Sequence, residues 1–278
     1  MDLAGLDRDA TSYIRERRCK DGGYCFYRLE EPNAKDTYHA VSALRLMGVP
    51  LDDPSTESYL LEVQRPDGSY DNMYSAYHSV MALSTMGRTP ERDPMPFVRT
   101  HLRSHRPEGV PVEVVSAFGS LYMAMGLCHH LGDLPQPSTR EEIVRFVAGL
   151  RCGDGGFGRP EPTLIETREA LEMLAWLGKP LGTIESERLI RAFEDPGFGF
   201  VNVPGTSPAF LEHVHSGIVA CHAHALRPRH TEACATFIIK CRRSNGGFSR
   251  SAADGIPTLE DTHLAVESLS LLGFLLLH

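Results

Sequence analysis

The sequence of 278 residues predicts an all-α fold, an α/α toroid in which six helix pairs close into a ring and form one domain over residues 1–278. Three observations predict it. A glycine-rich phrase recurs at intervals of roughly 45 residues, the spacing of paired-helix repeats. Each phrase leads into a helical pattern, and most of these patterns end in Leu-Gly or Met-Gly. The two helices of a unit also differ in polarity. Such repeats remain one domain even at this length.

The recurring phrase has the form Gly-Gly-aromatic. Full copies are Gly22-Gly23-Tyr24, Gly155-Gly156-Phe157 and Gly246-Gly247-Phe248. Variants are Asp67-Gly68-Ser69-Tyr70 and Pro196-Gly197-Phe198-Gly199-Phe200, and a degenerate unit ends at Leu131-Gly132. We expect the phrase glycines to end the preceding helix in a left-handed cap, which glycine adopts without a steric cost.

A helix is expected on each side of the phrase. Apolar residues at helical spacing predict first helices such as Ala10–Arg18, Glu57–Gln64, Arg140–Leu150 and Thr231–Lys240. The second helices, as in 40–46, 170–174 and 264–269, are apolar on nearly all sides, which is typical of buried helices. We therefore expect the second helices to form an inner ring and the first helices an outer ring. An open solenoid would need polar capping repeats, so six units without one favour closure.

Composition excludes several classes of function. A formal net charge of −8 disfavours a nucleic-acid binder, which needs basic residues to neutralise phosphates. The first residues lack the basic and apolar pattern of a signal peptide, and no apolar run is long enough to span a bilayer, so we expect a cytoplasmic protein. Seven cysteines, an odd number, indicate reduced thiols.

Two longer phrases, Arg18-Cys19-Lys20-Asp21-Gly22-Gly23-Tyr24 and Arg151-Cys152-Gly153-Asp154-Gly155-Gly156-Phe157, carry a family resemblance. Together with the helices beginning Asp36-Thr37-Tyr38-His39 and Asp261-Thr262-His263, they resemble the prenyltransferase and squalene-cyclase repeat family. The resemblance covers nearly the whole chain and is weakest around residues 90–132. It implies an apolar central cavity that holds an isoprenoid chain. In the members that prenylate proteins it also implies a zinc ion and a helical partner subunit.

Polar residues recur at fixed distances before the helix-ending glycines. Twelve residues before five of these glycines lie Asp36, Ser75, Ser120, Glu166 and Asp261, and nine residues before them lie His39, His78, Met123, Glu169 and Leu264. Glu212 and His215 repeat the same separation in the fifth unit. An acid at a helix start is also a good cap. In a toroid these first turns would meet at one mouth of the cavity.

Several of these residues are candidates for substrate binding. We expect Glu212, His215 and His78 at the mouth, and Tyr38 and Tyr77 beside the histidines. Trp176 lies near the end of an inner helix. Aromatic rings there could line an isoprenoid pocket or stabilise a carbocation through their π electrons. Plain packing in the core is the alternative for each ring taken singly.

The resemblance also implies a metal site. Zinc-binding members of the family use an Asp at a helix start, a Cys two residues later and a His from another repeat. Here Asp261 and His263 have that spacing, with His in place of Cys, and ring closure would bring His39 beside them. Three ligands leave an open position, as catalytic zinc requires. A second candidate set is Glu212, His215 and His78.

The leading functional hypothesis is an isoprenoid-binding enzyme, similar to protein prenyltransferase β-subunits, that transfers or rearranges a prenyl group taken from an isoprenoid diphosphate. Asp261, His263 and His39 are its candidate catalytic residues. Two alternatives remain. One is a non-catalytic toroid that binds a lipid or peptide as a scaffold. The other is a terpenoid cyclase without the usual Asp-rich motif, because that position reads Thr258-Leu259-Glu260-Asp261-Thr262.

Overall fold

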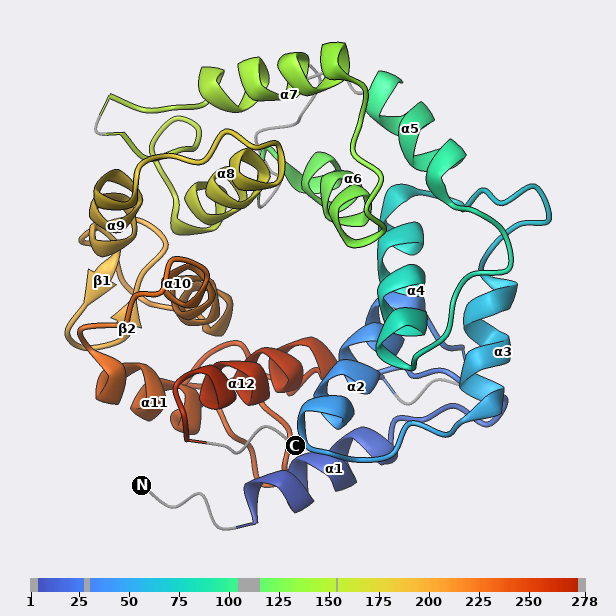
Figure 1. Ribbon diagram of the computed structural model, residues 1–278. Coiled ribbons are helices and arrows are strands. Elements are labelled where there is room, and N and C mark those ends of the chain that lie inside the picture. The colour runs from blue at the N-terminus through green and yellow to red at the C-terminus, as the bar shows by residue number, and fades with distance from the viewer. Residues whose placement is uncertain (1–4, 28–30, 105–115, 154, 275–278) are drawn as a thin grey trace.

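The structure, a computed structural model, describes residues 5–27, 31–104, 116–153 and 155–274. Over these residues the chain forms twelve helices and one two-stranded hairpin (Figure 1). The outer helices are α1 (Leu6–Arg15), α3 (Pro54–Glu62), α5 (Met95–Ser104), α7 (Pro137–Gly149), α9 (Thr183–Arg191) and α11 (Thr231–Lys240). The inner helices are α2 (Ala34–Leu46), α4 (Met73–Thr85), α6 (Gly119–His130), α8 (Leu164–Trp176), α10 (Leu211–Ala223) and α12 (Leu259–Leu271).

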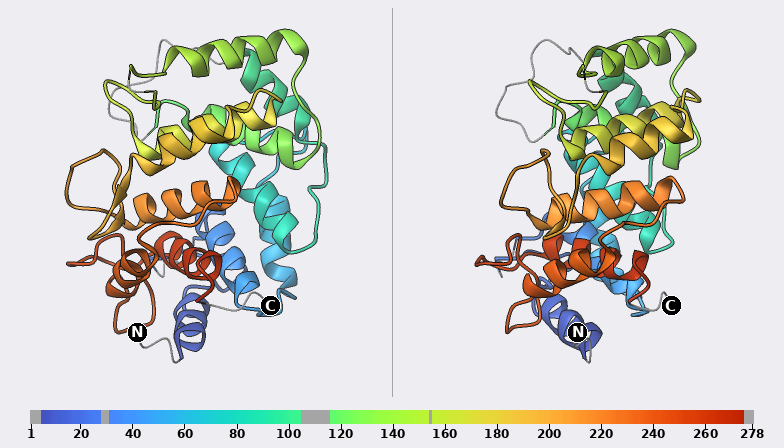
Figure 2. Two further views of the ribbon diagram at one scale, coloured as in Figure 1. Left: turned by 60° about the vertical axis from the view of Figure 1, so that its left-hand side comes forward. Right: turned by 90° about the vertical axis from the view of Figure 1, so that its left-hand side faces the viewer.

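The inner helices form a closed ring inside the outer ones (Figure 1). Each inner helix contacts the next, and α12 contacts α2, so the last repeat meets the first. The sequence-based prediction of an α/α toroid is confirmed. The outer seam is closed by an ion pair between Arg242 and Asp9 at 2.6 Å, and by the Tyr13 hydroxyl, which donates to the Pro257 carbonyl at 2.7 Å. Figure 2 shows α1 beside α11 from two further directions.

Neighbouring inner helices run parallel, with their first turns at one end of the ring. The evidence is that residues at matching positions meet. His39 of α2 contacts His263 of α12, both in the second turn of their helices. Tyr122 of α6 contacts Arg168 of α8, and both lie ten residues before their helix-ending glycines. We call the end of the ring where the inner helices begin the helix-start end.

The first turns of four inner helices share one capping arrangement, in which the side chain before the helix accepts a hydrogen bond from the backbone N–H three positions later. In α4 this pair is Asn72 and Ser75. In α2, α8 and α12 the N–H groups belong to acids, and the pairs are Asn33 with Asp36, Thr163 with Glu166 and Thr258 with Asp261. A side-chain oxygen at this position satisfies one of the free N–H groups of a helix start. The acids that recur twelve residues before the glycines therefore lie within caps.

The helix ends agree with the repeat for the inner helices and differ for the outer ones. Glycines 48, 87, 132, 178 and 273 follow the inner helices with φ between 68° and 79°, the left-handed cap conformation. The expectation that the Gly-Gly phrase caps the outer helix is wrong. Helix α1 ends at Arg15, and the phrase after it forms a separate turn closed by a bridge between Arg18 and Tyr24.

That turn needs glycine because it packs against the next repeat. A Cβ on Gly22, whose φ is 102°, would lie 2.2 Å from the carbonyl oxygen of Ser55. The phrase thus connects successive repeats, and the outer helices begin and end earlier than the sequence pattern predicted. Helix α7 begins at Pro137 rather than Arg140, with proline at a first-turn position that it favours. Only α11 has the predicted bounds.

The fifth repeat contains a short hairpin that the sequence pattern did not predict. Strands β1 (Glu194–Asp195) and β2 (Gly199–Phe200) pair antiparallel. Phe200 is fully buried, and a Cβ on Gly217 of α10 would lie 2.2 Å from its ring. Among the described residues, none of the helices has the length and apolar character needed to cross a membrane.

Candidate functional site

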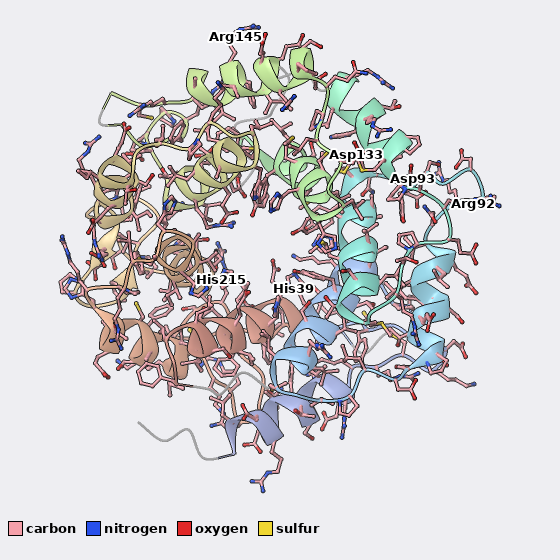
Figure 3. The ribbon with its side chains drawn as sticks, in the orientation of Figure 1. His39, Arg92, Asp93, Asp133, Arg145 and His215 are labelled. Atoms are coloured by element: carbon pink, nitrogen blue, oxygen red, sulfur yellow. The ribbon has the colours of Figure 1, made fainter. Side chains whose placement is uncertain are left out.

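Closure of the ring brings together two histidines from opposite ends of the chain. The Nδ1 atoms of His39 on α2 and His263 on α12 lie 3.0 Å apart, and both side chains are buried. One ring must hold the proton on Nδ1 and donate it to the other. Figure 3 shows His39 on the inner side of the ring. Ring closure thus brings His39 beside His263, the position in which the sequence analysis placed it.

Tyrosines and a third histidine surround this pair. The Tyr38 ring lies 5.7 Å from that of His263 and 6.2 Å from that of Tyr77, and the His39 ring lies 5.9 Å from that of His78. Edge-on and tilted ring contacts of this length are favourable. We call Tyr38, His39, Tyr77, His78 and His263 the histidine–tyrosine cluster. It is contributed by α2, α4 and α12, and it lies one to two turns inside the helix-start end.

Burial keeps the cluster uncharged. It lowers the pKa of His78 and that of His263 to about 4, and that of His39 well below 6.5, where the neighbouring His263 and His78 lower it further. Burial also raises the pKa of Tyr38 and of Tyr77. At neutral pH these are neutral rings that present π faces, hydroxyls and imidazole nitrogens.

Charged groups flank the cluster at the helix-start end. Lys35 of α2 forms an ion pair with Glu260 of α12, and Glu260 Oε1 lies 3.9 Å from His39 Nε2. The Lys35 ammonium is also 6.0 Å from the centre of the Tyr74 ring. The N-termini of helices carry partial positive charge, so parallel inner helices concentrate it at this end. A polar end therefore adjoins an uncharged aromatic interior.

Asp261 does not join the two histidines. Its Oδ2 accepts a hydrogen bond from the Thr258 hydroxyl at 2.7 Å within the helix cap, and burial raises its pKa to about 6. Among the described residues there is no group of three His, Cys, Asp or Glu side chains arranged to hold a metal ion. The set Asp261, His263 and His39 therefore supplies a pair of nitrogens without a convergent third ligand. As they stand, these residues do not fit a three-ligand zinc site.

The structure separates Glu212 from His215. Glu212 forms an ion pair with Arg250, whose Nε lies 2.6 Å from the Glu212 carboxylate, whereas His215 Nε2 lies 2.7 Å from Glu267 Oε2. Burial raises the pKa of Glu267, but the hydrogen bond and charge of His215 outweigh it and lower that pKa to about 2. His78 is held separately, with Nδ1 donating to the Tyr74 carbonyl at 2.8 Å.

Trp176 lies with a second aromatic group between α6 and α8. Its ring stacks on Tyr122 at 5.4 Å and on His129 at 5.2 Å. Tyr122 donates to the Glu172 carboxylate and receives a hydrogen bond from Arg168 at 3.0 Å. This side of the ring therefore combines an aromatic stack with a largely buried ion pair between Arg168 and Glu172.

Nearby on α8, Glu169 is buried and accepts a hydrogen bond from the Ser116 hydroxyl. Burial raises the pKa of Glu169 to about 7. Because Arg168 is close, its positive charge lowers the same pKa and limits the rise. Glu169 is thus a carboxyl group that changes charge near neutral pH.

Sequence reasoning missed Glu267, Glu172 and Arg168. A signal was present, because Glu172 and Glu267 both lie six residues before a helix-ending glycine, in the fourth and sixth repeats. Each carboxylate reaches back to the preceding inner helix, Glu172 to Tyr122 and Glu267 to His215. The position six residues before the glycine thus faces the first two turns of the preceding inner helix.

The closed ring and its internal aromatic residues define an α/α toroid of the prenyltransferase type. The family described as "Prenyltransferase alpha-alpha toroid domain" matches residues 4–83 and 91–276, and the chain belongs to it. Solved structures with this fold include "Candida albicans protein geranylgeranyltransferase-I complexed with GGPP". That match has 15% sequence identity and a TM-score of 0.66, and it covers 96% of this chain and 91% of the other. Comparison with curated proteins gives no match.

Proposed function

We propose that the chain binds an isoprenoid diphosphate, with the prenyl chain inside the ring and the diphosphate at the helix-start end, and transfers or rearranges the prenyl group. The single observation that carries this proposal is the histidine–tyrosine cluster. Five aromatic or imidazole rings from three inner helices meet there, and burial keeps them uncharged. Their apolar faces suit a prenyl chain, and tyrosine rings attract a developing carbocation.

The polar end next to the cluster supports the placement of the diphosphate. Lys35 supplies a cation there, and the inner helices contribute N–H groups and partial positive charge. The pairing of Lys35 with Glu260 would be exchanged for pairing with the diphosphate on binding. Membership of the prenyltransferase toroid family points the same way, and so does the similar geranylgeranyltransferase-I, which was solved in complex with GGPP.

Calorimetric titration tests this proposal. Geranylgeranyl diphosphate should bind, whereas inorganic diphosphate and geranylgeraniol, which carry only the head or only the tail, should bind at least tenfold more weakly. Replacing Tyr77 by Ala should weaken binding by about tenfold, about 1.4 kcal/mol. The matched control is Tyr27→Ala, because Tyr27 is 66% exposed. Absence of binding, or equal binding of inorganic diphosphate alone, overturns the proposal.

A toroid that binds its ligand without catalysis is a second candidate. The observation that favours it is the ion pair between Arg168 and Glu172 with the Tyr122 hydroxyl, which commits part of the inner helix layer to fixed internal contacts. Binding of geranylgeranyl diphosphate without release of diphosphate, in the presence of water and a simple thiol, would support this second function. Release of diphosphate on binding would exclude it.

A further inference from the structure

The contact between α10 and α12 contains a histidine–carboxylate pair with the arrangement of a general base. His215 Nε2 donates to Glu267 Oε2 at 2.7 Å, and the two side chains are 13% and 33% exposed. Figure 3 shows both His215 and His39 on the inner side of the ring. Since Glu267 accepts at Nε2, the proton of a neutral His215 ring lies on Nε2 and the lone pair on Nδ1.

The Nδ1 atom of His215 is available. It has no hydrogen-bond partner within the described part of the chain. It is also not fully enclosed by the protein, so a bound molecule can reach it. A histidine whose far nitrogen is held by a carboxylate, with the near nitrogen open toward a substrate, is the arrangement that orients an imidazole for proton transfer.

Among the four histidines that lie in the second turns of inner helices, His215 alone has a carboxylate within hydrogen-bond distance. His39 and His263 bond to each other, and His78 donates to the Tyr74 carbonyl. Glu260 lies 3.9 Å from His39 Nε2, beyond hydrogen-bond distance. Burial lowers the pKa of those three rings, whereas His215 has Glu267 within hydrogen-bond distance to orient its ring.

Helix α8 carries a carboxylate at the corresponding repeat position. Glu172 holds the same repeat position as Glu267, but its charge is already compensated by Arg168 and the Tyr122 hydroxyl. Glu267 has His215 as its hydrogen-bonding partner, although the more distant Arg168 also lowers its pKa. The pair on α10 and α12 is therefore the one that can gain a proton without leaving an uncompensated charge.

We propose that His215, oriented by Glu267, is the general base for the acceptor in prenyl transfer. This inference rests on the proposed function. The acceptor carries an O–H or S–H group. Its proton moves to His215 Nδ1 and its electron pair forms a bond to C1 of the prenyl group. The C1–O bond breaks, and its electrons leave with the diphosphate. His215 lies one turn inside the helix-start end, the level at which C1 would follow a diphosphate bound there.

Single-turnover assays on the full chain test the role of His215. Purified protein is mixed with geranylgeranyl diphosphate, in water alone and with 2-mercaptoethanol, and diphosphate release is followed alongside calorimetric binding. His215→Gln should slow release by on the order of 100-fold while the Kd changes by less than about twofold, because general-base catalysis contributes at least that much. Imidazole added to His215→Ala should restore part of the rate, which a structural role would not produce.

Glu267→Gln serves as the second variant and His222→Gln as the control. Glu267 is a positioning residue, so Glu267→Gln should lower the rate at least tenfold without changing the Kd. His222 is an exposed histidine on the same helix, and its replacement should change neither quantity. Circular dichroism at the assay temperature confirms that each variant is folded, and Glu267→Gln decides the matter if His215→Gln does not fold.

The outcomes separate this inference from the proposed function. An unchanged release rate in His215→Gln overturns the general base and leaves the proposed function in place. Loss of binding in that variant, with no rescue by imidazole, also overturns it by making His215 a binding residue. Binding by the wild-type protein with no release in water or thiol overturns the base and leaves a binding role. Absence of binding by the wild-type protein overturns both.

Discussion

His39 and His263 lie 224 positions apart in the sequence, yet their Nδ1 atoms are 3.0 Å apart at the contact between α2 and α12. This contact joins the first inner helix to the last and so depends on closure of the ring. Both imidazoles are buried, and His78 lies against them. A group of histidines that must stay neutral makes the stability of the fold depend on pH.

Stability is therefore expected to fall on acidification. The pKa of His78 is about 4 in the folded protein, against an ordinary value of 6.5, so the unfolded chain binds more protons between these pH values. Its contribution is fully present above pH 6.5 and is lost as the pH falls toward 4. His78→Asn, which can still donate to the Tyr74 carbonyl, should reduce the difference in free energy of unfolding between pH 7 and pH 5 by about 2 kcal/mol.

Urea unfolding at the two pH values provides the measurement. The control His222→Asn, at an exposed position, should leave the difference unchanged. Glu169 has the opposite dependence, because a pKa raised from 4.5 to about 7 gives stability that is lost as the pH rises through 7. Comparing each variant with the wild type removes this opposing contribution. An equal pH dependence in wild type and His78→Asn would refute the prediction.

The outer seam gives a second prediction. A Cβ on Gly247 would lie 2.5 Å from the ring of Tyr13, which is fully buried. Gly247→Ala should therefore lower the free energy of unfolding by about 2 kcal/mol, since overpacking a tight contact costs about 1–3 kcal/mol. Gly153→Ala is the matched control, because a Cβ there meets no atom within 4 Å. Equal stability of the two variants would show that the seam is loosely packed.

A third prediction concerns the ion pair between Arg168 and Glu172, whose side chains are 14% and 15% exposed. Glu172→Gln leaves the Arg168 charge without its carboxylate and should cost about 3 kcal/mol of stability. The double variant Arg168→Met with Glu172→Gln should recover most of it, because no unpaired charge remains. Arg65→Gln, at an exposed pair with Asp71, should have no measurable effect. Equally large losses in the single and double variants would be evidence against a charge effect.

The sequence predicted the architecture well because the signals for it are local and repeated. Glycines after the inner helices, such as Gly48 and Gly178, mark a backbone conformation that recurs in every clear repeat. The inner and outer layers follow from the polarity of each helix. The hairpin at β1 and β2 was missed, since it depends on Phe200 packing against Gly217 rather than on strand-like periodicity.

The site was only partly predictable because it depends on how each inner helix is rotated. Counting from the glycines placed His39 near the start of its helix, and the family resemblance with ring closure placed it beside His263, which the structure brings within 3.0 Å. Glu212 and His215 were grouped with His78 as a second candidate metal set, but Glu212 pairs with Arg250. The partner of His215, Glu267, lies on another helix at a different repeat position. Pairings across two helices cannot be read from the spacing within one.

The central claim is that the prenyl chain lies inside the ring, and the fluorescence of Trp176 tests it most directly. Trp176 is the one tryptophan in the chain, and it is stacked on Tyr122 between two inner helices. Titration with geranylgeranyl diphosphate should change its emission saturably, at the same Kd that calorimetry gives, and inorganic diphosphate should not change it. Calorimetric binding that leaves the emission of Trp176 unaltered would contradict the claim and place the ligand outside the ring.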